Sequence, residues 1–461
     1  MKRLFLTGIL LCVVFALPAQ TQHPEIKKFI QTNGFENASI GICVLDPSGK
    51  VLHEYNKNAA LTPASILKVV TTATALEVLG ENYCFSTTLS ADADTLIVHG
   101  TGDPTLGSRF FNSNFLDKWL PEIQKNIPNV SAITIDESYF GEEGMSERWI
   151  RQDIGIYYAP ACYGISIFDN TYHLYLDTYQ TDADGHPKIR EMQPKIPQMK
   201  FTNRLTVNQT NKDNGLIFCS PMSYNAVLSG DIPAEKEHFV LKGSIPDPGK
   251  VLGDLLADSL QNLGHPVSSV NILLANNHPL GQAFYTHYSP ELTKIIRETN
   301  VKSNNHYAEH LIRAIGKTLP EKDKSLLDGV QLVKNYWQKR GLNTQGLFLF
   351  DGSGLSPSNA LSPDFMCRLL YYMQTKSKYK EAFLASLPRA GKEGTVSNVL
   401  KNNKLEGVIY MKSGSIMGVQ CFAGYYINDD KSYPFAVMVN RFTCPRSETV
   451  KAIEKLLLGV F

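Results

Sequence analysis

Ser65 and Lys68 stand three residues apart at the start of a largely apolar segment, a spacing that could support nucleophilic catalysis. On a helix, residues three apart lie on the same face. A serine hydroxyl is a poor nucleophile until a base takes its proton, and a buried lysine with a lowered pKa can be that base. The N-terminus of the same helix would supply backbone N–H groups near a developing oxyanion. The pair alone is a weak pattern, because a capped helix with a solvated lysine has the same sequence.

Two further short patterns contain residues of related chemistry. A Ser-Asn-Asn run begins at Ser303 and ends at Asn305, and a Lys-Ser-Gly run begins at Lys412. Each pattern recurs by chance, but their order after the Ser65 pair is much more specific. The three patterns together predict one site assembled from three distant segments of the chain.

Local signals place Ser65 on a helix that follows a hairpin. Thr62 suits the N-cap and Pro63 the first helical position, so we expect a helix over residues 64–79 that stops at Gly80. Before it, residues 38–55 alternate in polarity on both sides of an Asp-Pro-Ser-Gly turn, which predicts a β-hairpin.

The C-terminal part of the chain should complete the same domain. Apolar spacing predicts helices over 291–299, 305–315 and 324–340, strands over 419–427 and 435–440, and a helix over 447–458. This order indicates an α/β (α+β) domain built from both chain ends, residues 24–83 and 283–461.

Residues 84–282 separate the first pattern from the second and are richer in short strand-like runs. We assign 84–163 and 243–282 to one inserted domain and 164–242 to a second, nested, β-rich insert. Residues 182–187 and 211–215 have the composition of hairpin loops. The insert contains none of the side chains that the three patterns mark as candidates for catalysis. We therefore expect it to shape access for bulky polymer strands and to leave the chemistry at Ser65 alone.

The three patterns, in this order, resemble those of the serine penicillin-binding proteins and β-lactamases. The long insert further resembles the D-alanyl-D-alanine carboxypeptidase/endopeptidase family of low-molecular-mass, class C penicillin-binding proteins. The Gly-Asp-Pro-Thr-Leu run at 102–106, the Asp-Gly-Ser-Gly-Leu-Ser run at 351–356 and the glycine-rich run at 391–395 support this resemblance. The chain departs from the usual motifs at Asn304, where aspartate is common, and at Ser413, where threonine is common.

The resemblance implies a penicillin-binding-protein/β-lactamase-like transpeptidase fold and a role for each motif residue. Ser65 would attack the carbonyl between two D-alanines and form an acyl-enzyme, with Lys68 as the base. Ser303, helped by Lys412, would pass a proton to the leaving amine. Asn305 would hold the substrate amide and fix Lys68.

The third motif would bind the substrate. The backbone N–H groups of Ser65 and Ser415 would form the oxyanion hole, with Gly414 between the two serines of the motif. The hydroxyls of Ser413 and Ser415 suit the terminal carboxylate. This chemistry requires no metal and no organic cofactor.

The implied partners are peptidoglycan stem peptides, with β-lactam antibiotics as covalent inhibitors. The balance between carboxypeptidase and endopeptidase activity stays open. Two alternatives also stay open: a β-lactamase, which the large insert argues against, and a non-catalytic wall-binding or sensor protein of the same fold. The intact Ser65, Lys68, Ser303, Asn305 and Lys412 argue against the non-catalytic alternative.

Composition excludes some other classes. The chain of 461 residues carries 45 basic and 44 acidic side chains, a net charge of +1 that argues against broad binding of nucleic acid. Lys2 and Arg3 precede an apolar run, which predicts a signal peptide over residues 1–19, export, and a periplasmic or cell-envelope location. An uncleaved anchor is the alternative. Peripheral membrane association and the oligomeric state stay open.

Three other features have simpler interpretations. Seven cysteines would remain after cleavage, without a Cys-x-x-Cys pair, and the odd number leaves at least one thiol without a partner in the chain. His306 and His310 have the spacing of a metal-binding pair, but no third ligand is evident from the sequence. Ser353 lies between two glycines, which favours a tight turn over a second nucleophile.

Overall fold

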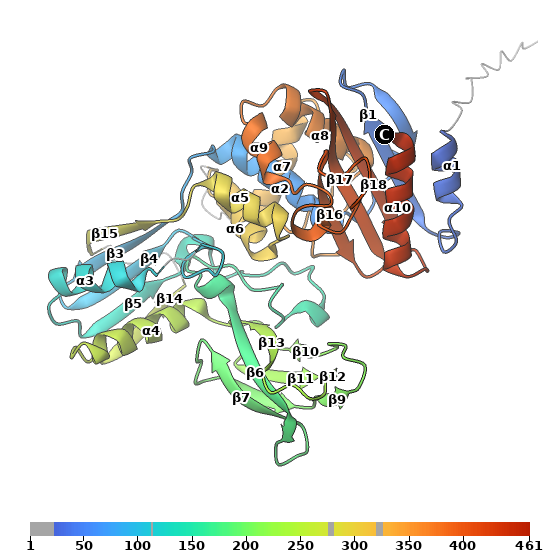
Figure 1. Cartoon of the computed structure of the whole chain (residues 1–461). Coiled ribbons are helices and arrows are strands. Elements are labelled where there is room, and N and C mark those ends of the chain that lie inside the picture. Colours follow the sequence, from blue (N-terminus) through green and yellow to red (C-terminus); the bar gives the residue numbers. More distant parts are fainter. Residues whose placement is uncertain (1–22, 112–113, 275–280, 320–325) are drawn as a thin grey trace, which may run out of the picture.

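The computed structural model describes residues 23–111, 114–274, 281–319 and 326–461, and Figure 1 shows their arrangement. The predicted signal peptide over residues 1–19 lies outside these ranges. Within them, no helix is both long enough and apolar enough to span a bilayer. The seven cysteines of the described ranges are all free.

A five-stranded antiparallel sheet joins the two ends of the chain. Its order is β16-β17-β18-β1-β2. Strand β1 lies alongside β18, with Ile42 opposite Val437. The α/β fold built from both chain ends is therefore confirmed, as is the hairpin within residues 38–55. The strands are β1 (Ser39–Leu45), β2 (Val51–Tyr55), β16 (Ile409–Ile416), β17 (Val419–Asn428) and β18 (Lys431–Asn440).

Both faces of this sheet are buried, because successive side chains of β1 and β18 enter two different cores. Val44 and Val437 pack in the core under α1 (Pro24–Ile30) and α10 (Arg446–Val460), while Cys43 belongs to the core on the other face. Figure 1 shows α1 and α10 together at one side of the sheet. The helices associated with the second core are α2 (Leu67–Leu79), α5 (Leu292–Val301), α6 (Asn305–Gly316), α7 (Leu326–Lys339), α8 (Pro363–Thr375) and α9 (Lys380–Ser386).

Helix α2 is a core helix, since residues 67–76 are all buried. It begins later than predicted, because Ala64–Ile66 form a 3-10 turn in front of it. The prediction that Thr62 caps the helix is wrong: neither helix start has a side-chain cap in the described structure. Instead, the backbone N–H of Thr62 donates to Oδ1 of Asn440 at 2.8 Å. Gly80 ends α2 with a φ of 88°, as predicted.

The inserted segment forms a second sheet in the order β14-β5-β4-β3-β15. Strand β15 pairs antiparallel with β3, so this sheet continues to residue 288, past the boundary predicted at 282. The exact domain division stays a prediction. The elements are β3 (Ser86–Asp92), β4 (Thr95–Gly100), α3 (Leu116–Asn126), β5 (Ala132–Asp136), α4 (Pro248–Asn262), β14 (Ser269–Leu273) and β15 (Gln282–Tyr288).

Smaller sheets fill residues 171–244 and share a core with the second sheet, since Leu96 and Leu228 belong to one hydrophobic cluster. Residues 182–187 connect the paired strands β6 and β7, as predicted. The prediction of a hairpin at 211–215 is wrong, because β9 and β10 lie in different sheets. The strands are β6 (Thr171–Thr181), β7 (Pro187–Gln193), β8 (Lys200–Asn203), β9 (Thr206–Asn208), β10 (Leu216–Phe218), β11 (Asn225–Ser229), β12 (Asp231–Pro233) and β13 (Phe239–Ser244).

Candidate active site

The fold brings the three sequence patterns together. Nζ of Lys68, on α2, lies 3.0 Å from Oγ of Ser65 and 2.6 Å from Oδ1 of Asn305, on α6. Nζ of Lys412, on β16, lies 2.9 Å from Oγ of Ser303. All five residues predicted to carry the chemistry therefore converge on one site, from segments that lie far apart in the sequence.

Lys68 is fully buried and has three hydrogen-bond acceptors around its amine. Besides Ser65 and Asn305, the backbone carbonyl of Ser353 accepts a hydrogen bond from Nζ at 2.6 Å. A neutral amine keeps only two N–H donors and gains a lone pair. When the two carbonyl oxygens take those donors, the lone pair faces the hydroxyl of Ser65. This is the orientation that a base needs.

Burial makes both lysines weaker bases than lysines in water. It lowers the pKa of Lys68 to about 7, although the carboxylates of Asp351 and Glu309 act in the opposite direction. Burial also lowers the pKa of Lys412 well below its ordinary value, and the charge of Lys68 adds to this effect. Lys68 is therefore balanced between its charged and neutral forms near neutral pH.

Two residues of the site have unusual backbone conformations. Ala64, just before Ser65, has a φ of 47°, and Ser303 has a φ of 58°. Non-glycine residues rarely adopt positive φ, and such strain persists where the surrounding structure enforces it. Asn304 follows with an ordinary extended conformation and caps α6, its side chain accepting from the N–H of Tyr307. The strained turn at Ser303 thus leads directly into a well-capped helix.

Strand β16 approaches the backbone at Ser65 closely at Gly414. A Cβ atom at this position would lie 2.4 Å from the carbonyl oxygen of Pro63 and 3.0 Å from the backbone nitrogen of Ser65. Only glycine allows this approach. Beside it, Oγ of Ser413 lies 2.7 Å from Oγ1 of Thr395, and Ser415 is partly exposed on the same strand.

The run at 351–356 is a turn that supports the site, in agreement with the turn interpretation of Ser353. Oδ1 of Asp351 accepts from the N–H of Gly354 at 2.8 Å, and its Oδ2 accepts from that of Ser356 at 2.7 Å. The hydroxyl of Ser353 accepts from a neighbouring N–H within the turn, while its carbonyl contacts Lys68. Sequence reasoning missed this carbonyl, because a backbone oxygen has no residue-type signature.

The inserted segment also contacts the site directly. The carbonyl of Tyr158 accepts from Nδ2 of Asn305 at 2.8 Å, and the indole N–H of Trp149 donates to Asp351 at 3.0 Å. The insert's backbone and one of its tryptophans therefore contact residues of the candidate site. That the insert leaves the chemistry at Ser65 alone stays a prediction.

A cavity of about 150 Å³ opens at Ser303 and Asn305, with Tyr157, Tyr158 and Arg109 of the insert on its wall. A neighbouring cavity of about 320 Å³ also has Arg109 in its lining. A substrate at the site would therefore contact both the catalytic motifs and the insert.

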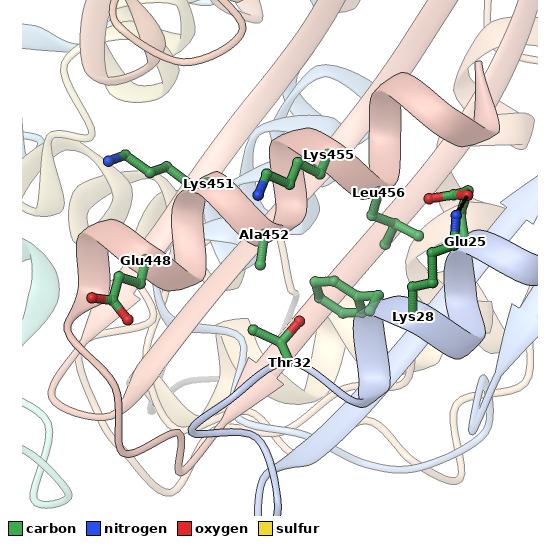
Figure 2. Close-up of a pocket in the computed structure, with 9 residues that line it drawn as sticks. Glu25, Lys28, Thr32, Glu448, Lys451, Ala452, Lys455 and Leu456 are labelled. Carbon is green, nitrogen blue, oxygen red and sulfur yellow. Dashed lines mark hydrogen bonds and ion pairs between the residues drawn. The ribbon is translucent and has the colours of Figure 1, made fainter.

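A third cavity, of about 350 Å³, lies between α1 and α10 and contains none of the motif residues. Figure 2 shows Lys28, Lys451 and Lys455 at this groove together with Glu25 and Glu448.

His306 and His310 are buried beside Cys162, and the three can present ligand atoms within 4.8 Å of one another. The structure thus supplies the third candidate ligand that the sequence did not reveal. The rings already have hydrogen-bond partners, however. Oγ of Ser166 lies 3.2 Å from Nε2 of His306 and 3.0 Å from Nε2 of His310. Nδ1 of His310 lies 2.8 Å from the carbonyl of His306. These contacts are consistent with a packing role for the pair.

Comparison with known proteins identifies relatives over almost the whole chain. Residues 22–457 match the D-Ala-D-Ala carboxypeptidase 3 (S13) family. The chain is 26% identical over 447 residues to a D-alanyl-D-alanine carboxypeptidase of Actinomadura sp. strain R39, covering 91% of this chain and 81% of that protein. It is 24% identical over 442 residues to the D-alanyl-D-alanine carboxypeptidase DacB of Haemophilus influenzae, covering 92% of this chain and 89% of that protein.

Solved structures agree with this assignment at the level of the fold. The crystal structure of penicillin-binding protein 4 from Haemophilus influenzae matches with a TM-score of 0.80 at 23% identity, covering 94% of this chain and 98% of that chain. A structure of that protein in complex with a β-lactam matches with a TM-score of 0.76 at 23% identity, covering 95% and 99% of the two chains. The resemblance drawn from the motifs is confirmed: the chain belongs to the D-Ala-D-Ala carboxypeptidase 3 (S13) family.

Proposed function

We propose that this carboxypeptidase is a serine-type enzyme that cleaves D-Ala-D-Ala ends of peptidoglycan stem peptides through an acyl-enzyme on Ser65. One observation carries the proposal. The buried amine of Lys68, with a pKa of about 7, lies 3.0 Å from the hydroxyl of Ser65. A base poised near working pH and within hydrogen-bond reach is what a serine nucleophile needs.

In the acylation step, Oγ of Ser65 attacks the carbonyl carbon between the two D-alanines while the amine of Lys68 takes the hydroxyl proton. The backbone N–H groups of Ser65 and Ser415 would stabilise the oxyanion. The carbon–nitrogen bond then breaks, and Ser303 gives a proton to the departing amine. Lys412 restores that proton, since its lowered pKa makes its ammonium a better proton donor. D-Alanine leaves, and an ester remains on Ser65.

Deacylation repeats the chemistry with water as the nucleophile. Water attacks the ester carbon and loses a proton, which passes through Ser303 to the neutral amine of Lys412. The ammonium of Lys68 returns its proton to Oγ of Ser65 as the ester bond breaks, and the shortened stem peptide is released. The same steps cut a cross-link when the leaving amine belongs to a neighbouring strand, which is the endopeptidase form of the reaction. A β-lactam would acylate Ser65 in the same way and act as a covalent inhibitor. We further propose that the protein is exported, on the pattern in residues 1–19.

The test has two parts, both made on the purified chain. Mass spectrometry of muropeptides should show loss of one D-alanine from pentapeptide stems. A fluorescent penicillin should label the wild type and fail to label Ser65→Ala, while thermal unfolding shows that the variant is folded. Persistent labelling of Ser65→Ala would remove Ser65 as the nucleophile. Labelling without any change in muropeptides, combined with rapid turnover of a chromogenic cephalosporin, would instead indicate a β-lactamase.

A further inference from the structure

Lys68 is oriented by a backbone carbonyl that belongs to the turn at 351–356. The Ser353 carbonyl and Oδ1 of Asn305 each accept from Nζ at 2.6 Å. These are the two acceptors that direct the lone pair of the neutral amine toward Ser65. Whatever fixes the Ser353 carbonyl therefore fixes the direction of the base.

Glu309 holds the two peptide units that precede this carbonyl. Its Oε1 accepts from the N–H of Gly352 at 3.0 Å and from that of Ser353 at 2.9 Å. The carbonyl's own peptide unit is held by Asp351, whose Oδ1 accepts from the N–H of Gly354. Glu309 follows Asn305 by four residues on α6, so both side chains lie on one face of the helix. The carboxylate is buried, with 1% of its surface exposed. Hydrogen bonds from amides to a buried carboxylate are strong, because the local dielectric is low and the acceptor is charged.

We propose that Glu309 is a positioning residue for acylation. By holding the turn that carries the Ser353 carbonyl, it keeps the Lys68 amine aimed at Ser65. The inference rests on the proposed acylation of Ser65 and adds to it a residue that none of the three motifs contains.

The charges around the two groups determine the sign of the effect. Lys412 faces Lys68 from β16, Asp351 faces both Lys68 and Glu309 from the turn, and Arg313 interacts with Glu309 along α6. Burial and Asp351 raise the pKa of Glu309 to about 7, against the effect of Arg313. A nearby carboxylate stabilises the ammonium form of Lys68. Where Glu309 is ionised, near and above pH 7, removing its charge therefore lowers the pKa of Lys68 further and increases the share of the neutral amine.

The test compares the pH dependence of acylation by a chromogenic β-lactam in the wild type and in Glu309→Gln. Glutamine keeps an oxygen acceptor for Gly352 and Ser353 but removes the charge. Because Glu309 itself takes up a proton near pH 7, its charge acts only in the upper part of the acid limb, the pH range over which the acylation rate falls. There the variant should be acylated up to about threefold faster than the wild type, and at lower pH the two rates should converge. The plateau rate at high pH should stay within about threefold, because the orientation of the amine is kept.

Two further variants separate charge from geometry. Glu309→Asp keeps the charge, but its shorter side chain places the carboxylate farther from the turn. The acylation rate at high pH should therefore fall, while the acid limb stays nearer its wild-type position. The matched control is Glu137→Gln, the same substitution at another buried glutamate, which lies on the inserted segment and in none of the three motifs. This control variant should have the same acid limb of acylation as the wild type.

The outcomes are distinct. If the acid limb of the pH profile is the same in Glu309→Gln as in the wild type, Glu309 has only a structural role, whether or not the unfolding temperature falls. This result overturns the inference but leaves the proposed acylation at Ser65 intact. If Glu309→Gln fails to fold, Glu309→Asp decides the question. A Glu309→Asp variant whose acid limb and high-pH acylation rate both equal those of the wild type would also overturn the inference. Labelling that persists in Ser65→Ala refutes the proposed function itself.

Discussion

The carbonyl oxygen of Tyr158 accepts a 2.8 Å hydrogen bond from Nδ2 of Asn305. Because the amide nitrogen is held by this carbonyl, the amide oxygen faces Lys68, at 2.6 Å. A backbone atom of the insert thus selects which end of the Asn305 side chain meets the base. The insert therefore contacts the candidate site through its main chain.

Asn305→Asp should slow acylation at neutral pH. The carboxylate would place a negative charge beside the Lys68 amine and raise the pKa of Lys68, so the acid limb moves to higher pH. It would also lose the donor to Tyr158. We expect about a tenfold to hundredfold lower rate at pH 7, measured as labelling by a fluorescent penicillin across the pH range. Asn304→Asp is the matched control, since aspartate caps a helix as well as asparagine does. A limb that moves to lower pH in Asn305→Asp would contradict this account.

The wild-type enzyme should acylate more slowly as the pH falls through about 7. Burial lowers the pKa of Lys68 to about this value, so below it the amine is protonated and cannot take the Ser65 proton. Lys68→Arg keeps the charge but cannot deprotonate, and should lose acylation by about a thousandfold at every pH. Stopped-flow acylation from acid to alkaline pH measures both effects. Lys339→Arg, at an exposed position on α7, is the control. A near-normal rate in Lys68→Arg would remove Lys68 as the base.

Gly414→Ala should separate β16 from the nucleophile. The added Cβ would lie 2.4 Å from the carbonyl oxygen of Pro63, so the strand or the 3-10 turn must shift. A displacement of the oxyanion donors of this order costs about a hundredfold in acylation rate. Gly346→Ala is the control, because the nearest atom to its new Cβ is 3.7 Å away. The idea fails if Gly414→Ala acylates at the wild-type rate while remaining folded.

The sequence predicted the motif side chains and most regular elements because these depend on local signals. Ser65, Lys68 and Lys412 are distinctive residue types in a fixed order. In the two strands near the C-terminus, apolar residues alternate with polar ones or follow one another in runs, a pattern typical of strands in a buried sheet. The Asp-Pro-Ser-Gly turn has a composition that few other conformations accept.

What sequence reasoning missed depends on contacts between distant segments. The carbonyls of Ser353 and Tyr158 act through atoms that every residue possesses. Nothing in the local sequence distinguishes Glu309 from other helical glutamates, because its contacts with the turn at 351–356 form only in the folded protein. The segment 211–215 has the composition of a hairpin loop, yet the strands on either side of it pair with other strands, β9 with β12 and β10 with β11. Strand pairing depends on contacts across the whole sheet and not on the loop alone. The 3-10 turn before α2 likewise arises where Gly414 brings β16 against the chain.

The pairing of β1 with β18 has a consequence for biosynthesis. A chain made from its N-terminus carries Ser65 long before its last strand exists. Strand β1 can pair with β2 early, but almost all of the protein must be synthesised before β18 can occupy its other edge. Until then that strand has an unpaired edge that other strands could join in error. Contacts between residues so far apart in sequence also form slowly. Ser65 and Lys412 can consequently come together only after most of the chain, β16 included, has been synthesised.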